Sequence, residues 1–240
     1  MITNEWIREM NEYEDFARKR GPHVVVVDAI IAAGKTTFIQ VIVPALQARG
    51  FRVVVAKEPV DRWEKNGILK TFDEDKSRWG FTFQSTVFVD RINEIRRQFS
   101  EHPNADIYIL ERSPFTDRLF MEMLHEDGTV TDLEKTLYEG WADLWTILVP
   151  RLPTLFLYLR PSLDVCMQRI EKRKREGEKK ITREYQRKLL EKHDAYLKPS
   201  GVLIHNMRIP CIIINTDEDF ENDTTIQLKL ADYVYRQLCA

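Results

Sequence analysis

The stretch AIIAAGKTT, residues 29–37, nearly fits the phosphate-binding pattern G-x-x-x-x-G-K-[ST]. Gly34, Lys35 and Thr36 occupy their required positions, and Ala29 stands where the pattern has its first glycine. In such a loop the backbone N–H groups at a helix N-terminus cradle phosphates, the lysine reaches the β- and γ-phosphates, and the hydroxyl binds Mg²⁺. Alanine is the smallest replacement for glycine and fails only where the backbone needs a positive φ. We therefore predict a working loop rather than an ordinary strand-turn-helix that contains Gly-Lys.

Two carboxylates and an arginine follow the next apolar runs. Glu58 comes just after the run that ends at Ala56, and Glu111 and Arg112 follow the run that ends at Leu110. Ligands of open α/β sheets bind beyond the carboxyl ends of the strands, so these groups are expected to meet the phosphate loop in one crevice. Taken singly, Glu58 fits an idle turn carboxylate, and Glu111 with Arg112 fits a strand-end ion pair. Together they favour phosphoryl transfer, which needs a phosphate cradle, a metal, positive charge and a base.

The elements that must position these groups alternate between strands and helices. Short apolar runs rich in β-branched residues predict strands buried on both faces of a parallel sheet. Helical patterns between them predict βαβ units, right-handed crossovers and a doubly wound α/β fold. The expected strands are His23–Val27, Arg52–Ala56, Ile107–Leu110, Thr154–Leu159 and Cys211–Asn215, and the expected helices are roughly 35–49, 77–101, 114–146, 162–176, 182–198 and 222–238.

The chain, residues 1–240, is expected to form a single domain, because no internal repeat or Pro/Gly-rich linker divides it. An N-terminal helical extension within residues 1–20, roughly 4–19, is expected to pack on the outside. Pro44 lies inside the helix that follows the phosphate loop, and we expect a kink there or a break one turn later.

The predicted helix over Trp79–Arg97 carries polar residues on an otherwise apolar stripe. Gly80, Gln84, Val87 and Arg91 fall within one narrow sector of a helical wheel. One interpretation is a helix boundary where Gln84 and Arg91 extend to water. The other is a pocket wall, in which the Gln84 amide offers one donor and one acceptor to the edge of a base.

The run RIEKRKREGEKK, residues 169–180, holds seven basic and three acidic residues. Such runs form solvated helix faces, nuclear-localisation signals or nucleic-acid patches. Beside a phosphate loop a further interpretation competes, which is an arginine lid that closes on the phosphate being transferred.

Composition is that of an ordinary globular protein. The 240 residues are 43% hydrophobic and 31% charged with a net charge of −2, so general attraction to nucleic acid or to an anionic membrane is not expected. Cys166, Cys211 and Cys239 form no metal-binding pattern, and their odd number suggests reduced thiols. The N-terminal segment has no apolar run and includes acidic residues, and no stretch approaches a membrane span. We expect a cytoplasmic location.

Five motifs in order resemble the deoxynucleoside kinase family, in particular its deoxycytidine and deoxyguanosine kinase-like members. AIIAAGKTT resembles the family's G-N-I-A-A-G-K-S-T, and EPVDRW its E-P-V-x-x-W. WGFTFQ is similar to W-x-F-x-F-Q, and ERSPFTDR to E-R-S-x-x-S-D-R. CMQRIEKRKREGEKKI matches the lid segment without a gap, and NTDEDF matches the loop on the adenine side. The resemblance extends from about residue 24 to residue 220.

The resemblance implies roles on the phosphate side. Glu58 resembles the general base that takes the proton of the nucleoside 5′-hydroxyl, and Arg112 resembles the arginine that holds Glu58 and the reacting oxygen. Thr36 and Glu111 resemble the residues on the Mg²⁺ side. Lys35 and Arg173 are also expected to be catalytic residues. Lys35 contacts the β- and γ-phosphates, and Arg173 resembles the arginine that stabilises the charge of the transition state. The ATP contacts implied are Ala29, Ile30, Ile31, Ala32, Ala33, Gly34, Lys35, Thr36, Thr37, the lid arginines Arg169, Arg173 and Arg175, and Asp219 and Phe220 beside the donor base.

The resemblance also implies roles on the nucleoside side. Gln84 corresponds to the base-reading glutamine, and Glu178 to the carboxylate that binds the sugar 3′-hydroxyl. Asp73 stands where the family commonly has a tyrosine that helps to hold this hydroxyl, so we expect Asp73 near the sugar. The positions that correspond to the apolar walls of the pocket are Val60, Trp63, Phe83 and Met121.

Base preference is expected to depend on Arg91 and Asp117. In the resembled enzymes an arginine–aspartate pair at these positions accompanies cytosine or purine preference. A carboxylate held by Arg91 only accepts hydrogen bonds, which suits the exocyclic amine of cytosine or adenine better than the carbonyl of thymine. Val87 is larger than the alanine of some members, which narrows the pocket and favours pyrimidines.

We therefore predict an ATP- and Mg²⁺-dependent deoxynucleoside kinase that uses deoxycytidine and purine deoxynucleosides ahead of thymidine. The implied fold is the three-layer α/β sandwich of P-loop kinases, with a five-stranded parallel sheet, a helical lid at about 169–181, and assembly into a homodimer. The alternatives are a thymidine-preferring or broad-specificity kinase, a thymidylate kinase-like enzyme, and a non-catalytic nucleotide-binding regulator with a basic nucleic-acid patch.

Overall fold

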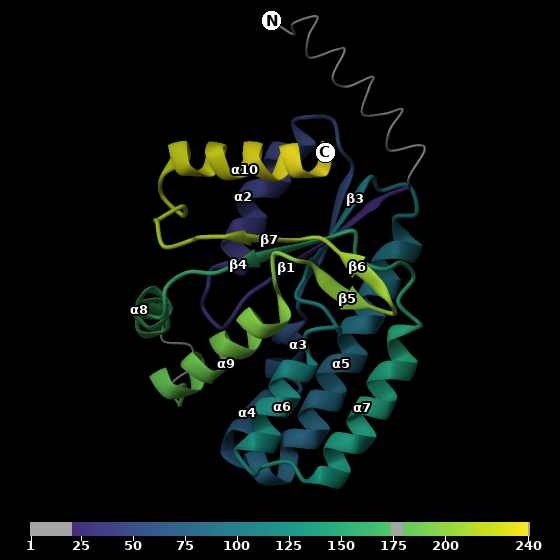
Figure 1. Cartoon of the computed structure of the whole chain (residues 1–240), viewed down its shortest axis with the longest axis vertical. Helices are drawn as coiled ribbons and strands as arrows, with labels where there is room; N and C mark the ends of the chain where they lie inside the picture. The colour runs from purple at the N-terminus through teal and green to yellow at the C-terminus, as the bar shows by residue number, and fades with distance from the viewer. Residues whose placement is uncertain (1–20, 174–179, 240) are drawn as a thin grey trace, which may run out of the picture.

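A computed structural model describes residues 21–173 and 180–239, and a five-stranded parallel sheet forms its centre (Figure 1). The sequence predicted all five strands, each with one end displaced by one residue. The expected five-stranded parallel sheet is therefore confirmed. The strands are β1 (His23–Asp28), β2 (Val53–Ala56), β3 (Ile107–Glu111), β4 (Leu155–Leu159) and β7 (Cys211–Ile214), in the spatial order β2-β3-β1-β4-β7.

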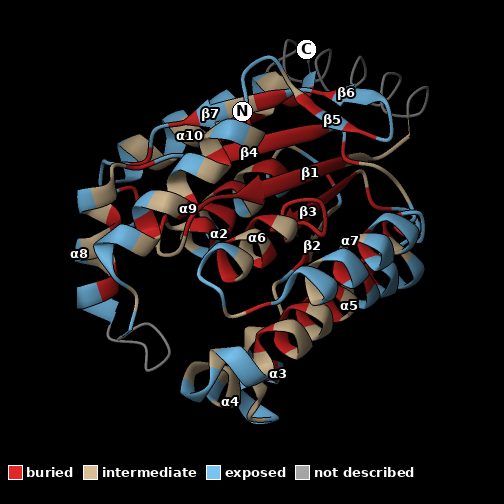
Figure 2. Ribbon diagram, turned by 60° about the horizontal axis from the view of Figure 1, so that its bottom comes forward, coloured by how far each residue is buried: buried red, intermediate tan, exposed pale blue. Residues whose placement is uncertain are grey.

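Helices cover both faces of this sheet (Figure 1). On one face α2 (Lys35–Gln47) and α10 (Thr224–Cys239) pack on Val25 and Val27. On the other face α5 (Lys76–Glu101), α6 (Arg118–Glu126) and α7 (Asp132–Thr146) belong to the core that contains Val24 and Val26. Because successive side chains of a strand point to opposite faces, four consecutive buried valines supply both cores. Figure 2 shows the strands buried between the helical layers, which is the predicted three-layer sandwich.

The remaining elements lie around the rim of the sheet. Helices α8 (Leu163–Arg173) and α9 (Arg183–Tyr196) match the predicted patterns at 162–176 and 182–198, within the part that the structure describes. Three further pieces were not predicted: α3 (Val60–Lys65), α4 (Ile68–Glu74) and the antiparallel hairpin of β5 (Val202–Ile204) with β6 (Met207–Ile209). Each is short, so its periodicity is too brief to detect from the sequence.

The single helix predicted over 114–146 is wrong, because this segment forms α6 and α7. Gly128 has a φ of 71°, in the left-handed region that ends helices. Thr131 then begins α7 with a capping box, in which its hydroxyl accepts from the Glu134 N–H and the Glu134 carboxylate accepts from the Thr131 N–H. These two local signals outweigh an apolar periodicity that continues across the break.

Helix α2 ends at Gln47, about one turn beyond Pro44, as the sequence predicted. The Pro44 carbonyl still accepts from the N–H of Ala48 at 2.9 Å, so the proline lies in the last turn rather than at a central kink. Among the described helices, none combines the length and the apolar character needed to cross a membrane.

The strand order brings three chain segments to one edge of the sheet. Strands β2 and β1 both pair with β3, and the registers place Ala56 opposite Leu110 and Val27 opposite Glu111. The chain therefore leaves these three strands at nearly the same level, at the edge where ligands of open α/β sheets bind.

Candidate functional site

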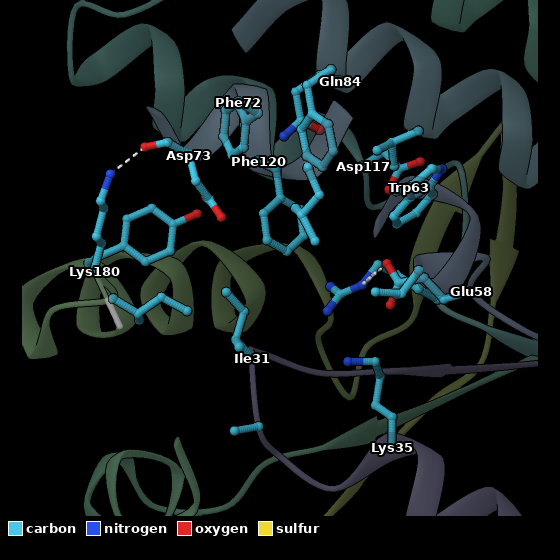
Figure 3. A pocket seen from close by; sticks show the side chains of 18 of the residues that line it. Ile31, Lys35, Glu58, Trp63, Phe72, Asp73, Gln84, Asp117, Phe120 and Lys180 are labelled. Atoms are coloured by element: carbon cyan, nitrogen blue, oxygen red, sulfur yellow. Dashed lines mark hydrogen bonds and ion pairs between the residues drawn. The ribbon is translucent and has the colours of Figure 1, made fainter. Parts of the chain in front are cut away.

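A cavity of about 690 Å³ opens at this edge of the sheet. The loop after β1, the segments after β2 and β3, and helices α4, α5, α6 and α9 all contribute to it. Figure 3 shows Lys35 at one end of the cavity, Gln84 and Asp117 at the other, and Glu58 between them. A cavity of this size accommodates a small organic ligand.

The loop after β1 tolerates alanine in place of its first glycine. Positive φ values occur at Ala32, 61°, and at Gly34, 95°, and Ala29 is not among the positive-φ residues. The replaced glycine therefore stands where an L-residue meets no left-handed strain. Two side chains hold the loop by its carbonyls: Gln186 donates to Ile31 at 2.8 Å and Arg169 donates to Ala33 at 3.1 Å.

The residues predicted to form the phosphate loop divide into two groups. Ala29, Ile30 and Ala33 are buried beneath the loop and belong to the core. The residues of the loop that line the cavity are Ile31, Ala32, Gly34, Lys35, Thr36 and Thr37. This geometry is that of a helix N-terminus presenting its backbone N–H groups to an anion.

Lys35 and Thr36 lie at the base of the cavity. Burial, together with the positive charge of Arg112, lowers the pKa of Lys35 to about 8. The Thr36 hydroxyl donates to Oε1 of Glu111 at 2.5 Å, and both residues line the cavity. A hydroxyl and a carboxylate are oxygen ligands of the kind that Mg²⁺ takes beside phosphates. Among the described residues, acidic, histidine and cysteine side chains do not cluster in threes as a self-sufficient metal site.

Glu58 lies between two arginines. Nη2 of Arg91 donates to its Oε1 at 2.6 Å, and Nε of Arg112 lies 3.4 Å from the same oxygen. Burial raises the pKa of Glu58, but the charges of Arg112 and Arg91 outweigh burial and hold it below its ordinary value. Glu58 is therefore ionised at neutral pH, and it is paired and largely buried rather than a solvated turn carboxylate.

Arg91 also contacts Asp117, and the pair is buried. Burial raises the pKa of Asp117 to about 6, against the opposing charge of Arg91. Oδ2 of Asp117 is buried and accepts no hydrogen bond within the described parts of the chain, so it is an available acceptor. Gln84, Val87 and Arg91 line the cavity, and Gln84 and Arg91 are only 6% and 3% exposed. The polar stripe of α5 is therefore a pocket wall and not a solvated helix boundary.

Aromatic and apolar side chains form the sides of the cavity. Val60, Trp63 and Phe83 line it as predicted, and Trp63 donates to Asp90 at 3.0 Å. Phe72 stacks on Phe83 with ring centroids 4.4 Å apart. The flat faces of this group suit a planar heterocycle.

The prediction for Met121 is corrected by the structure. Its side chain is buried in the core with Leu124 and is not among the described residues that line the cavity. Phe120, one position earlier on α6, faces the cavity instead and lies 4.7 Å from the Arg112 guanidinium. A helix turns about 100° per residue, which here directs Phe120 to the cavity and Met121 to the core.

Asp73 lines the cavity on the side away from Glu58 (Figure 3). Its carbonyl accepts from Nζ of Lys180 at 2.6 Å, and burial raises the pKa of its carboxyl. Arg173, the last described residue of α8, also lines the cavity. The two other predicted lid residues, Arg175 and Glu178, lie outside the described residues.

The residues expected beside the donor base lie behind the phosphate loop. Phe220 covers Gly34 so closely that a Cβ there would come 2.9 Å from its ring. Arg169 lies over the Phe220 ring and donates to the carbonyls of Ala33 and Thr216. Asp219 is exposed, and its carboxylate accepts from Glu221 and Asn222. None of these three predicted contacts is among the described residues that line the cavity.

Sequence reasoning missed several side chains at the site, among them Asp28, Phe120 and Tyr185. Asp28 ends β1, is fully buried and lies 3.4 Å from Nη1 of Arg112. Its position at a strand end was an available signal, equal to that of Glu58. Phe120 and Tyr185 line the cavity from α6 and α9, and spacing alone does not distinguish such aromatics from core residues.

Comparison with known proteins agrees with this geometry. A sequence model of the family described as deoxynucleoside kinase matches residues 25–240. The chain is 31% identical to the probable deoxycytidine kinase of fowlpox virus over 212 residues, which cover 88% of this chain and 86% of that protein.

Two further relatives are named after nucleosides with other bases. The mitochondrial deoxyguanosine kinase of Xenopus laevis is 29% identical, with 82% of this chain and 83% of that protein covered. Human mitochondrial thymidine kinase 2 is 29% identical, with 85% of this chain and 74% of that protein covered. At these identities the relatives leave the base preference of this chain open.

The loop geometry generates a test of the missing glycine. Ala29→Gly is expected to leave the affinity for a nucleoside triphosphate unchanged and to lower the free energy of unfolding by up to about 1 kcal/mol, because glycine gains entropy in the unfolded chain. Urea unfolding and equilibrium titration measure both. Gly34→Ala, where φ is positive, is the matched contrast and should cost about 1–3 kcal/mol. A clear gain of stability or affinity in Ala29→Gly would contradict the absence of strain at this position.

Proposed function

The chain belongs to the deoxynucleoside kinase family, and from this premise we propose that it transfers the γ-phosphate of ATP to the 5′-hydroxyl of a deoxynucleoside. The observation that carries the proposal is the position of Glu58. Two arginines hold it between the phosphate loop and the part of the cavity that polar side chains of α5 and α6 line. A nucleoside with its base toward Gln84 and Asp117 presents its 5′-hydroxyl toward Glu58 and Lys35.

Glu58 is the proposed general base. Arg91 and Arg112 both contact its Oε1, and we assign its Oε2 to the substrate hydroxyl. Its lowered pKa keeps it charged but makes it a weak base. This suits phosphoryl transfer, because the loose transition state demands little activation of the nucleophile before the P–O bond breaks.

Positive charge on the phosphate side comes from three residues. Lys35 lies at the base of the loop, Arg112 lies beside Glu58, and Arg173 of α8 lines the cavity. We assign Lys35 to the β- and γ-phosphates and Arg112 to the reacting oxygen. Arg173 is assigned to the charge that develops on the transferred group.

Thr36 and Glu111 would hold Mg²⁺ in this reaction. Their oxygens meet at 2.5 Å beside the phosphate loop, and the two line the same cavity. A bound Mg²⁺ supplies positive charge that neutralises the phosphates.

The charge arrangement favours an alcohol acceptor over a nucleotide acceptor. A thymidylate kinase-like enzyme needs arginines available for the phosphate of its acceptor. Arg91 and Arg112 are instead paired with Asp117, Glu58 and Asp28. An added phosphate at Glu58 would therefore meet a carboxylate whose positive partners are already engaged.

For the base, we propose deoxycytidine and purine deoxynucleosides ahead of thymidine. Asp117 is an acceptor held by Arg91, and its Oδ2 accepts nothing else within the described residues. The exocyclic amine of cytosine or adenine can donate to it, whereas thymine offers a carbonyl oxygen and a methyl group. Two facing acceptors leave both unsatisfied, at about 1–3 kcal/mol. Guanine is accommodated if Arg91 donates to its carbonyl, and Val87 narrows the pocket in favour of pyrimidines.

The sugar is proposed to lie beside Asp73. Asp73 lines the cavity on the side away from Glu58, and Lys180 donates to its backbone carbonyl. Asp73 would accept a hydrogen bond from a sugar hydroxyl where the resembled enzymes have a tyrosine.

A homodimer is proposed from the outer face of α7. Large apolar side chains recur at helical spacing along this helix and just beyond its end, and each is at least 39% exposed. A second copy of the chain offers the same face, which suits the self-complementary contact of a twofold dimer. The residues of this face include Leu133, Leu137, Trp141, Leu144 and Leu148. The expected cytoplasmic location stays a prediction, since some relatives are mitochondrial.

The proposed base generates the first kinetic test. Glu58→Gln is expected to keep nucleoside binding and to lower kcat by about 100-fold or more, because the amide cannot accept the proton. Initial rates with ATP, Mg²⁺ and each natural deoxynucleoside measure the effect. Glu64→Gln, an exposed position on the neighbouring α3, is the matched control and should keep its activity. Near-normal turnover in Glu58→Gln would remove Glu58 from the mechanism.

The base assignment has its own test. The double variant Arg91→Met with Asp117→Ala is expected to raise thymidine use and depress deoxycytidine use, shifting the ratio of their kcat/KM values by roughly 10- to 100-fold. The matched control is Arg97→Met with Glu101→Ala, an exposed ion pair on the same helix α5. A wild-type enzyme that prefers thymidine would overturn the base preference and leave the kinase reaction standing.

The dimer face is tested by adding a charge to it. Leu144→Glu is expected to convert the dimer to a species with the mass of one 28.4 kDa chain, measured by sedimentation equilibrium. Leu228→Glu places the same charge on an equally exposed leucine of α10 and should leave the dimer intact. Dissociation by both variants, or by neither, would place the interface elsewhere.

A further inference from the structure

A buried histidine stands behind the catalytic arginine and has no part in the mechanism above. His193 lies on α9 and is fully buried, as is Asp28 at the end of β1. Nε2 of His193 is 3.7 Å from Oδ1 of Asp28, and that same oxygen is 3.4 Å from Nη1 of Arg112. Phe120 lies beside both Arg112 and His193, with its ring centroid 4.7 Å from the guanidinium and 6.1 Å from the centroid of the imidazole.

The hydrogen bonds of His193 determine its protonation state. Nδ1 lies 2.8 Å from the carbonyl oxygen of Leu189, which only accepts, so Nδ1 carries a proton. If the ring were neutral, Nε2 would then direct a lone pair at the Asp28 carboxylate in a site closed to water. A second proton on Nε2 converts this repulsion into an ion pair. As a neutral acceptor, Nε2 would receive no hydrogen bond from any described residue.

The other groups around the ring agree with a cation. Tyr158 of β4 stacks on the imidazole, and its hydroxyl donates to Asp194. The Asp194 carboxylate is bound by Arg160, so it is compensated locally. Asp28, which Arg112 also contacts, is thus the carboxylate that faces His193. His193 and Arg112 hold the pKa of Asp28 well below its ordinary value, although burial opposes them.

These contacts form one chain of alternating charge that extends through the site. Asp117 contacts Arg91, Arg91 contacts Glu58, Glu58 contacts Arg112, and Arg112 contacts Asp28. These contacts join three carboxylates to two arginines, and the neighbouring buried Lys35 and Glu111 add one charge of each sign. An imidazolium at His193 completes the alternation and balances the buried charges.

We propose that His193 is a buried imidazolium whose ion pair with Asp28 positions the Arg112 guanidinium against Glu58. Arg112 needs this support because its backbone has a φ of 68°, in a region that side-chain-bearing residues rarely adopt. The Asp28 carboxylate also accepts from Thr116 and from the N–H of Ala29, so its own position is fixed from the phosphate loop. His193 is a positioning residue in this scheme, since it touches neither substrate.

The inference rests on the proposed kinase reaction, but its first test does not require activity. In the enzyme labelled with ¹⁵N-histidine, both ring nitrogens of His193 are expected to be protonated at neutral pH, with or without substrates. The chain has five histidines, and the resonances missing from the His193→Asn spectrum identify those of His193. A neutral His193 ring would overturn the proposal even if the enzyme is a fully active kinase. Absence of kinase activity together with a doubly protonated ring would instead overturn the proposed function.

The second test separates positioning from simple support of the fold. His193→Asn retains an amide donor for the Leu189 carbonyl and removes only the group that faces Asp28. It is expected to lower kcat by about 10-fold or more, with much smaller changes in the KM values for nucleoside and ATP, because Arg112 loses its alignment rather than its charge. Leu189→Ala, a buried position on the same helix, is the matched control. It should lower the melting temperature while kcat at 25 °C is retained.

Coupling between the two residues completes the test. Asp28→Asn is expected to lower kcat at least as far as His193→Asn, and the double variant to lose no more than Asp28→Asn alone, because the histidine acts only through the aspartate. Losses that multiply in the double variant, or a His193→Asn enzyme with full kcat, would overturn the proposal. Should Asp28→Asn fail to fold, the nitrogen spectrum and the comparison of His193→Asn with Leu189→Ala still decide it.

Discussion

The balance of buried charge is the constraint on which the site depends. Removing an ion from water costs several kcal/mol unless an opposite charge and hydrogen bonds replace the solvent. In this protein Asp28, Glu58 and Asp117 each meet a guanidinium, and Arg91 and Arg112 each contact two of these carboxylates. No member of this chain of contacts can move far without leaving a buried charge uncompensated. The groups that face the cavity are therefore held in place before a ligand enters, which is the preorganisation that electrostatic catalysis requires.

The sheet supplies the scaffold for that balance. Strands β2, β3 and β1 are neighbours, and their registers bring Glu58, Arg112 and Asp28 to one edge from chain segments far apart in sequence. Arg91 comes from α5 and Asp117 from the N-cap of α6, so the helical layer on one face of the sheet completes the arrangement. The charged residues that follow the strands are thus brought together at one edge of the sheet. Arg91 of α5 supplies an opposite charge to Glu58 there, which offsets the cost of burying the carboxylate.

Arg91 links two parts of the cavity that have different proposed tasks. One of its nitrogens contacts Asp117, which faces the base end, and another contacts Glu58, which faces the phosphate loop. A base that disturbs Asp117 would therefore disturb Glu58 through a single rigid guanidinium. In the proposed reaction, recognition of the base and reactivity of the hydroxyl would be coupled through Arg91 without any large movement of the chain, because this shared group has two fixed partners.

The sequence by itself determined the sheet, the phosphate loop and most of the side chains in the cavity. The sheet, the phosphate loop and the wall of α5 depended on local signals: the run Val24–Val27, the pattern ending in Gly34 and Lys35, and the polar stripe on one side of α5. The sequence also identified Glu58 and Arg112, because both follow predicted strands. The other side chains predicted for the cavity came from the resemblance to a known family. Tertiary structure alone decided what these groups contact. The break at Gly128 overrode a continuous apolar periodicity, and Phe120 rather than Met121 faces the cavity. Asp28 and His193 meet although 165 positions separate them in the chain. Pairing between buried charges depends on distances across several elements, and no spacing in a single sequence encodes those distances.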